Sequence, residues 1–428
     1  MYAGDFDVIV KKLLEASSSK YFDKYDTISK GAGVCYFCAE KREVYGFVNT
    51  YNSYTVDKTG FVSGGFRQEN AWRNYPVCDT CAKELENGKR FIENNMSSRF
   101  CGFNYSIIPK VTFENKQGIE EILSLFADYE KRKFSLRDET SRSLLQSEKD
   151  FIKIMAESEN NLNYNMLIYR EEQAGAVFRI LAFIEDIVPS RLKNILKVKT
   201  QIEKEDYFKG IRGNENSTYD MKYSFECLRR FFPNNKIEGN FDKSFLEIVN
   251  NIFSSRNVSY EFLLDKIMQS VSERFLKGEY FENLLLEGFM NVRFIERLKL
   301  FNNIRKGENC YMLEKNEKNK IFLDYLELHK ETFDNDTKKA VFLTGVLTEK
   351  LLKIQYMERK STPFYSRLNG LKLSDKLVKR IYTEAINKLN EYNKNYYTEL
   401  ESIIAEYIMS PSSLSNDEIS FFFALGMS

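Results

Sequence analysis

Apolar residues recur at helical spacing through most of the chain. One clear stripe consists of Ile119, Ile122, Leu123, Phe126 and Tyr129, which the three-to-four spacing places on one side of a helix. The same spacing predicts helices over residues 244–253, 259–275, 280–300, 340–356 and 374–409. We therefore expect a mainly α-helical protein with a C-terminal helical bundle.

Other segments carry strand patterns. Apolar and polar residues alternate over 43–55, and 105–113 is a second short strand, which Pro109 favours placing at a sheet edge because proline donates no backbone hydrogen bond. Residues 162–168 and 176–184 are apolar enough to be strands or buried helices. The polar stretch between them is compatible with a hairpin.

These patterns divide the chain into four segments. We expect an N-terminal helix over residues 1–30 and a small α+β module over 31–113. A mostly helical middle domain should follow over 114–335, and the helical bundle over 336–428. Within the bundle, Ser415 and Glu418 have the spacing of a capping box in front of the last helix.

Two C-x-x-C pairs carry the strongest chemical signal. Cys35 and Cys38 form the first pair, and Cys78 and Cys81 form the second. Each pair bends the backbone into a knuckle, and two knuckles supply the four thiolates that a tetrahedral zinc ion needs. We therefore expect one structural zinc in the module over 31–113. The long stretch between the pairs should be an inserted β structure.

A redox dithiol is the rival interpretation of a C-x-x-C pair. That chemistry needs only one pair, in a thioredoxin-like βαβ setting. Neither pair has such a setting, and the presence of two pairs favours zinc.

Composition limits the possible partners and the compartment. The 428 residues include 63 Lys and Arg against 62 Asp and Glu, so any contact with nucleic acid must come from local patches. The three cysteines outside the pairs are scattered, as in a reducing compartment. With no signal peptide and no long apolar run in the sequence, we expect a cytoplasmic protein without a membrane partner.

The sequence favours a binding protein over an enzyme. His329 is the only histidine, and a single histidine near a helix end is usually a packing or surface residue. The phosphate-binding pattern of P-loop proteins is absent from the sequence. A zinc ion held by four thiolates has no open position for water. We therefore expect no catalytic residues and no small-molecule substrate.

Three cationic stretches are candidates for nucleic-acid contact. The first is an acid-free stretch with Arg191, Lys193 and Lys197, and the second places Arg229 and Arg230 beside Phe231 and Phe232. The third consists of Lys58, Arg67 and Arg73 near the only tryptophan, Trp72. Each has a structural alternative. The first stretch would be a solvated helix face, and the second would be the end of a helix that buries its aromatic side chains in the core. The third would lie around a buried tryptophan that fixes the insertion to the zinc knuckle.

Several motifs together resemble the large subunit of subtype I-B CRISPR Cascade complexes. The most specific lie in the cysteine module, and the similarity covers nearly the whole chain. The motifs are Cys35-x-x-Cys38, Gly60-Phe61-Val62-Ser63-Gly64-Gly65-Phe66, Ala71-Trp72, Pro76-Val77-Cys78-x-x-Cys81, Gly102-Phe103-Asn104-Tyr105, Val188-Pro189-Ser190-Arg191, Arg229-x-Phe231-Phe232-Pro233 and Phe364-Tyr365-x-Arg367-Leu368-Asn369-Gly370.

The resemblance implies a non-catalytic subunit of an RNA-guided antiviral complex. Such subunits help to recognise the protospacer-adjacent motif, hold the displaced DNA strand and dock the helicase-nuclease. Their C-terminal bundle resembles the small subunit of Cascade. The implied partners are the other Cascade subunits, the CRISPR RNA, target DNA and the helicase-nuclease. Family members usually carry a further region ahead of the cysteine pairs, which this chain is expected to lack.

Two alternatives from other classes stay open at the level of sequence. One is a zinc-stabilised protein-interaction scaffold that binds no nucleic acid. The other is a divergent metal-dependent nuclease. An adjacent CRISPR array and neighbouring genes for Cascade subunits would favour a Cascade component over the protein-interaction scaffold.

Overall fold

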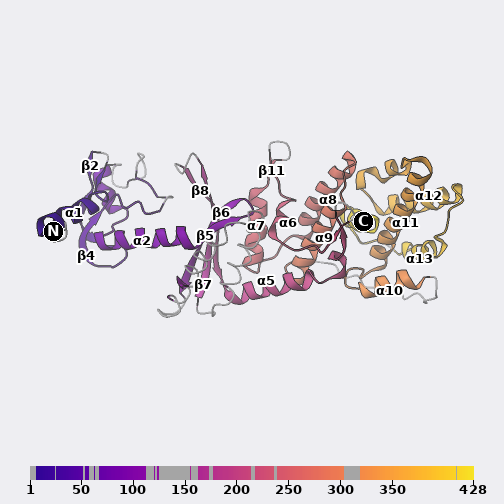
Figure 1. The fold of residues 1–428 in the computed structure, drawn as a ribbon, viewed down its shortest axis with the longest axis horizontal. Helices are drawn as coiled ribbons and strands as arrows, with labels where there is room; N and C mark the ends of the chain where they lie inside the picture. The colour runs from indigo at the N-terminus through magenta and orange to yellow at the C-terminus, as the bar shows by residue number, and fades with distance from the viewer. Residues whose placement is uncertain are drawn as a thin grey trace. The chain divides into compact units, whose positions relative to one another are not determined.

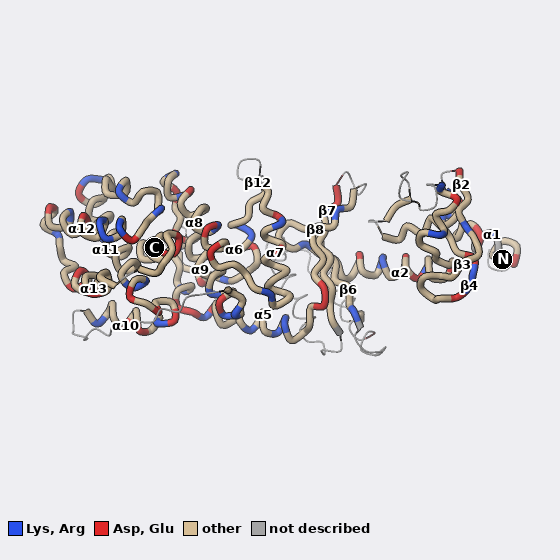
Figure 2. Tube along the Cα trace, turned by 180° about the vertical axis from the view of Figure 1, so that it is seen from behind, with Lys and Arg blue, Asp and Glu red and all other residues tan. Residues whose placement is uncertain are grey.

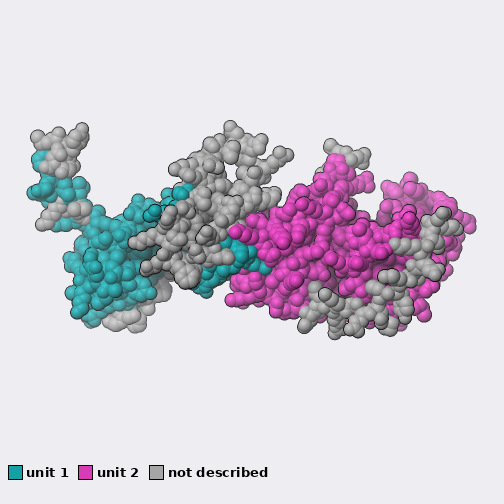
Figure 3. Space-filling view, turned by 90° about the horizontal axis from the view of Figure 1, so that it is seen from below, with its two compact units in different colours: residues 1–192 teal, residues 193–428 magenta. Residues whose placement is uncertain are grey.

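A computed structural model of the chain describes residues 6–111 and 162–428, apart from 25, 52–53, 57–61, 63–66, 173–176, 214–216, 236–238, 303–318 and 411, together with residues 120, 123–124 and 155. The described residues form two compact units, Met1–Leu192 and Lys193–Ser428 (Figure 3). This division differs from the four segments expected from the sequence. The strands predicted within the middle segment belong to the first unit, and the middle helices belong with the C-terminal ones.

The first unit begins with α1 (Asp7–Ser19), so the N-terminal helix is shorter than the expected 1–30. Two small hairpins follow it. The first pairs β1 (Asp23–Lys24) with β2 (Thr27–Ile28), and the second pairs β3 (Lys30–Val34) with β4 (Lys41–Tyr45). The predicted strand over 43–55 therefore ends at Tyr45. The 3-10 helix η2 (Gln68–Arg73) and helix α2 (Asp79–Asn95) complete this part.

Trp72 anchors η2 onto the second hairpin. A Cβ atom at Gly31 would lie 2.6 Å from the Trp72 ring, so glycine is the only residue that lets the indole approach the β3 backbone this closely. Trp72 is half-buried and packs against the core cluster that contains Val44 and Val77. This is the anchoring role given above as the alternative to nucleic-acid contact.

Helix α2 leads from this cluster to a four-stranded antiparallel sheet (Figure 1). The strand order is β5-β6-β7-β8, with β5 at Ser97–Phe100, β6 at Phe103–Val111, β7 at Leu162–Glu172 and β8 at Val177–Ile187. Strands β7 and β8 form the hairpin that the sequence allowed.

The edge position predicted for the strand around Pro109 is wrong. Strand β6 pairs with β5 on one side and β7 on the other. However, β5 pairs with Phe103–Ser106, so among the described strands the backbone of Pro109 has a neighbour only on the β7 side, where Tyr164 lies opposite. Because the paired β5 segment is short, the sheet accommodates a proline in an inner strand.

In the part of the second unit that the structure describes, helices joined by loops predominate, with two short strand pairs. Its helices are α5 (Pro189–Ile202, which begins in the first unit), α6 (Phe225–Arg229), α7 (Asp242–Phe253), α8 (Tyr260–Lys277), α9 (Glu282–Arg297), α10 (Lys320–Leu328), α11 (Asp336–Arg359), α12 (Asp375–Glu391), α13 (Thr398–Ile408) and α14 (Asn416–Met427), with 3-10 helices η3 (Asp206–Phe208) and η5 (Pro363–Leu371). Two small antiparallel pairs join β9 (Ile211–Arg212) to β10 (Thr218–Tyr219) and β11 (Asn234–Asn235) to β12 (Gly239–Asn240). The expected fold class, mainly α with a small α+β module and a C-terminal helical region, is confirmed.

Helix α11 is the centre of the C-terminal helices. It contacts α12, α13 and α14, and α14 also contacts α8 and α9. Helices α11 and α14 cross at Gly345 and Gly426, where a Cβ atom on either glycine would lie 2.0–2.1 Å from a carbonyl oxygen of the other helix. Glycine at both positions is therefore what allows the two backbones to touch.

Two further predictions for this region have different outcomes. The Ser415–Glu418 capping box is confirmed, with both reciprocal hydrogen bonds present. The continuous helix over 374–409 is wrong, because α12 ends at Glu391 and α13 begins at Thr398. Asn393, in the connection, has a left-handed backbone (φ 53°), which a continuing helix does not allow.

Candidate metal centre and cationic residues

The four paired cysteines come together at one point. The Sγ atoms of Cys35, Cys38, Cys78 and Cys81 all lie within 4.8 Å of one another, and all but Cys38 are buried. The pairs are thus positioned as the sequence predicted.

Local backbone structure explains how the first knuckle forms. Cys35 directly follows β3, and its N–H donates to the Glu40 carbonyl (2.9 Å), while the Ala39 N–H donates back to the Cys35 carbonyl (3.0 Å). Ala39 adopts a left-handed backbone (φ 57°), which turns the chain into β4. This turn brings the Cys38 side chain close to that of Cys35.

The second knuckle lies at the start of α2. Cys78 is the N-cap residue of that helix, and Cys81 lies in its first turn. Backbone hydrogen bonds join the two knuckles, since the Tyr36 N–H donates to the Pro76 carbonyl (2.8 Å) and the Tyr45 N–H to the Val77 carbonyl (2.9 Å). The four thiols are therefore held together by the backbone.

The electrostatic setting differs among the thiols. Burial alone would raise the pKa of the Cys35 thiol, but hydrogen bonds from backbone N–H groups of Cys38, Cys78 and Phe37 lower that pKa to about 6. The Cys78 N–H, for example, lies 3.4 Å from the Cys35 sulfur. Burial raises the pKa of Cys78 and of Cys81. N–H donors directed at sulfur stabilise a thiolate, the form that binds metal.

The donor set fits a tetrahedral metal ion. The Cys38 and Cys78 sulfurs lie 3.9 Å apart, close to the ~3.8 Å that separates two sulfurs each about 2.3 Å from a tetrahedral zinc. The same distance is too long for a disulfide. The four cysteines could therefore hold a metal ion.

Three aromatic rings pack together beside the knuckles. The Phe37 ring centroid lies 5.4 Å from that of Tyr36 and 5.8 Å from that of Tyr75. Tyr36 and Phe37 stand between the first two cysteines, and Tyr75 lies shortly before the second pair. The position of these rings therefore depends on the two knuckles being together.

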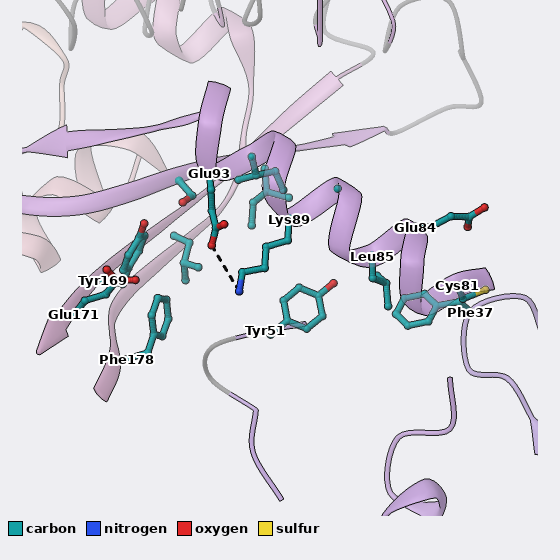
Figure 4. A pocket seen from close by; sticks show the side chains of 15 residues that line it. Phe37, Tyr51, Cys81, Glu84, Leu85, Lys89, Glu93, Tyr169, Glu171 and Phe178 are labelled. Carbon is teal, nitrogen blue, oxygen red and sulfur yellow. Dashed lines mark ion pairs between the residues drawn. The ribbon is translucent and has the colours of Figure 1, made fainter. Parts of the chain in front are cut away.

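A hollow of about 360 Å³ opens beside Cys81 and Phe37, along α2 and the sheet (Figure 4). Its lining includes Tyr51, Tyr169 and Phe178, and the Lys89–Glu93 ion pair (3.6 Å) lies along it. Apart from this ion pair and a few other polar side chains, the lining is mainly apolar and aromatic.

The acid-free stretch lies in α5 and is only partly available to a partner. Leu192, Ile195 and Val198 form the buried face of this helix. Lys193 and Lys197 are exposed, whereas Arg191 is buried, and this burial lowers the pKa of its guanidinium. Lys193 and Lys197 remain candidates, and Arg191 is poorly placed to meet a phosphate.

The second pair of arginines has internal partners. Arg229 donates to the Asp242 carboxylate (2.5 Å) and to the Phe232 carbonyl (2.7 Å), and Arg230 pairs with Glu287 (2.5 Å). Phe231 and Phe232 are fully buried. Phe231, Phe232 and Arg229 fit the packing alternative described above, whereas the Arg230 side chain is 58% exposed.

The third group lies around η2. Arg67 and Arg73 are exposed, and the Arg73 guanidinium lies 4.9 Å from the centre of the Trp72 ring. Lys58 lies outside the described residues.

His329 is a packing residue. Its ring lies 4.1 Å from that of Tyr207 and 4.5 Å from that of Tyr325, measured between centroids. Burial lowers the pKa of its imidazole, while the nearby Asp206 and Glu205 carboxylates act in the opposite direction.

Sequence reasoning missed one group of exposed cations and tyrosines. Residues 356–360 contain one tyrosine and two cations, residues 391–397 contain three tyrosines and one lysine, and Arg359 lies over the Tyr392 ring at the end of α11. The helical spacing of Tyr392 and Tyr396 made both residues resemble core residues.

Comparison with known families gives the class of protein. Residues 32–187 match the model for the central domain of CRISPR-associated protein TM1802, and residues 223–428 match the model for its C-terminal domain. The first match lies in the first unit and the second match in the second. The chain is therefore a CRISPR-associated protein. It belongs to the TM1802 family, whose central and C-terminal domains it carries.

No curated protein matches the chain significantly. In the part of the chain that the structure describes, no helix is both long and apolar enough to cross a membrane.

Proposed function

We propose that this chain is a non-catalytic large subunit of a CRISPR interference complex of the I-B Cascade type. In this role it contributes to target-DNA binding and to recruitment of the helicase-nuclease, in the cytoplasm. The observation that carries the proposal is the pair of family matches, which together span most of both units. In such complexes base pairing with the guide reads the sequence, while protein groups contact the backbone.

The four-cysteine cluster supports a structural role for the first unit. The proposed metal is zinc, held by Cys35, Cys38, Cys78 and Cys81, because four thiolates in tetrahedral arrangement are typical of structural zinc sites. When bound, zinc supplies a fixed cross-link between the β3–β4 knuckle and the start of α2. This chain's own residues orient the thiolates through the backbone hydrogen bonds described above.

The proposed DNA contacts are modest and local. Lys193 and Lys197 present exposed charge on one side of α5, and Figure 2 shows that cations and acids are otherwise interspersed along the chain. Each lysine that contacts a phosphate should contribute roughly 0.9 to the slope of log affinity against log salt.

The test compares the reconstituted complex with and without this chain, bound to guide RNA and titrated with target DNA. We expect target binding to weaken strongly without the chain. Substitution of Lys193 and Lys197 together by alanine should reduce the salt slope by about two units. Lys243→Ala, an exposed cation on α7, is the matched control and should leave the slope unchanged.

Two results would contradict the proposal. Target binding that is equally tight without the chain would favour a scaffold with no nucleic-acid role. Failure of the chain to enter the complex would remove the Cascade assignment.

A further inference from the structure

The hollow along α2 is a feature of the first unit that neither the four-cysteine cluster nor the proposed DNA contacts use. We name it the α2 groove. Leu85, Gly88 and Ile92 line it from α2, and Leu167 and Tyr169 line it from the sheet (Figure 4). The groove therefore lies between a helix and the face of a sheet.

The groove is long for its volume. Its lining positions on α2 run from Cys81 to Glu93, which at 1.5 Å per residue is a length of about 18 Å. This is the length of about five residues of extended chain. Phe37 and Cys81 line the end beside the four-cysteine cluster, so the two knuckles fix that end of the groove.

Gly88 occupies the middle of the α2 wall. A Cβ atom at this position would meet nothing within 4 Å among the described residues, and Gly88 is not one of the glycines with a positive φ. Neither close packing nor a left-handed backbone therefore requires glycine here, although glycine weakens a helix interior relative to alanine. Its observable effect is to keep the groove open at its centre. A position that breaks a local rule without a structural gain is expected at functional sites.

Aromatic side chains lie along the groove and remain partly exposed. Phe37 is 43% exposed and Tyr51 is 47% exposed. The rings of Tyr169 and Phe178 stack on each other, with 4.7 Å between their centroids. Exposed apolar groups that gather together mark interaction sites, and aromatic residues are common among those that carry binding energy.

The apolar surface continues from the groove onto β8. Phe183 lies directly opposite Leu167, and Ile180 lies directly opposite Tyr169, so both belong to the face of the sheet that lines the groove. Phe183 and Ile180 are partly exposed. A partner seated in the groove can therefore also cover this part of the sheet.

Carboxylates outnumber cations in the groove. Among the described residues that line it, the charged ones are Glu84, Glu93 and Glu171 against Lys89. The Lys89 ammonium group is paired with Glu93 at 3.6 Å. Three carboxylates and one ammonium group leave the lining with an excess of two negative charges.

The cations of the sheet do not offset this excess. Arg179 and Lys110 are each paired with a carboxylate, and the Arg170 guanidinium lies over an aromatic ring. Arg99 is exposed on β5, and none of these four residues lines the groove. The groove is therefore suited to a cationic partner and poorly suited to phosphates.

We propose that the α2 groove binds a short segment of a partner protein that combines apolar anchor side chains with lysine or arginine. The anchors gain from burial against the aliphatic and aromatic lining, and the basic side chain gains from the excess of carboxylates. The same carboxylates disfavour nucleic acid, whose binding depends on cations that meet phosphates. The length of the groove matches an extended segment better than a compact small molecule. This contact goes beyond the proposed function, because it requires no DNA.

The test measures binding of the full chain to a fluorescent peptide probe, Leu-Arg-Phe-Arg-Leu, by anisotropy. We expect saturable binding with a Kd below about 1 mM, since burial of two or three anchors supplies this much affinity. A probe with glutamate in place of both arginines should bind at least about threefold more weakly. A probe with serine in place of the three apolar residues should show no saturable binding.

Gly88→Leu closes the groove without removing any contact of the fold. The new side chain takes the place of an anchor, so binding of the arginine probe should weaken at least about tenfold. Leucine is a better helix former than glycine, so the melting temperature should be unchanged or higher, which excludes misfolding as the cause. Asn87→Leu adds the same side chain to α2 at an exposed position outside the groove, and this matched control should retain binding.

Glu171→Lys tests the charge of the groove separately. It should weaken binding of the arginine probe about threefold and tighten binding of the glutamate probe. A variant that is merely misfolded would lose both probes, so the reversed preference reports the position of the charge.

Several outcomes would overturn the proposal. These are a wild-type chain that does not bind the arginine probe, equal binding by Gly88→Leu, or a wild-type preference for the glutamate probe. Displacement of the arginine probe by single-stranded oligothymidine would assign the groove to nucleic acid instead. The proposed function is tested by the titration of the reconstituted complex with target DNA, so failure of either one is distinguishable from failure of the other.

Discussion

At the scale of single residues, Cys78 has the most connected role in the first unit. It occupies the N-cap position of α2, belongs to the four-cysteine cluster and directs its N–H at the Cys35 sulfur. It also belongs to the buried cluster that contains Val44 and Val77. Loss of its thiol should therefore affect metal binding and folding together.

We expect Cys78→Ser to lose zinc and to unfold the region around the knuckles. Structural zinc contributes on the order of 10 kcal/mol to folding in small metal modules, and a serine oxygen is a poor replacement for a thiolate. Elemental analysis and thermal unfolding provide the measurement. Cys227→Ser, at a buried cysteine of the second unit, is the control and should retain the metal. Full zinc content in Cys78→Ser would refute the ligand assignment.

Arg229 is predicted to stabilise the fold. Its partner Asp242 is 6% exposed, so Arg229→Ala leaves a buried carboxylate without its cation. We expect a loss of about 3 kcal/mol in the free energy of unfolding, measured by denaturant titration. Lys193→Ala, at an exposed position, should change stability by less than about 0.5 kcal/mol. Equal effects of the two substitutions would contradict the structural role.

The sequence was informative about the cysteines and much less so about the arginines. The geometry of a C-x-x-C pair can be predicted from the sequence, because the short spacing fixes where both thiols point. Whether Arg229 meets a phosphate or Asp242 depends on a residue from another helix. Local spacing contains no information about that partner.

At the scale of elements, the crossing of α11 and α14 is the most demanding contact. Gly345→Ala should destabilise the protein by about 1–3 kcal/mol or more, because the new methyl group would overlap the Phe423 carbonyl oxygen. In an exposed helix the same change would stabilise by about 1 kcal/mol. A loss of stability in Gly345→Ala would therefore indicate that the α11 and α14 backbones are in close contact, whereas a gain would not.

Gly88→Ala on α2 is the matched control for this substitution. A Cβ atom there meets nothing within 4 Å, so alanine should raise stability by about 0.5–1 kcal/mol. Differential scanning calorimetry of both variants decides the matter. If both variants are stabilised, α11 and α14 do not cross at this point.

Element boundaries show why helix patterns alone were insufficient. Capping by Ser415 was predictable because both capping partners lie within one turn. The break between α12 and α13 was not, since Tyr392 and Tyr396 continue the helical spacing across it. Tyr396 is exposed, and the periodic pattern cannot distinguish a tyrosine that packs from one that faces solvent.

At the scale of the whole molecule, we expect the purified chain to lack nuclease and ATPase activity. The single histidine packs between tyrosines, and a metal site made of four thiolates has no position for a reacting water. Incubation with single- and double-stranded DNA in the presence of magnesium or manganese checks this. Cleavage that survives further purification and disappears on substitution of an acidic residue would show that the chain is an enzyme.

The division of the chain into two units was the least predictable feature of the molecule. The sheet that joins β6 to β7 pairs residues such as Ser106 and Leu167, which lie far apart in sequence. The contact of α14 with α8 and α9 likewise joins distant segments. Such pairings depend on packing across the fold, which local periodicity does not encode.

The central claim is that this chain acts inside a guide-RNA complex. The most direct measurement is sequencing of the RNA that is isolated with a tagged form of the chain from its own cells, with an untagged strain as control. The account predicts strong enrichment of CRISPR RNAs, together with other CRISPR-associated subunits. Isolation of the folded chain with only the background RNA of the control would contradict it.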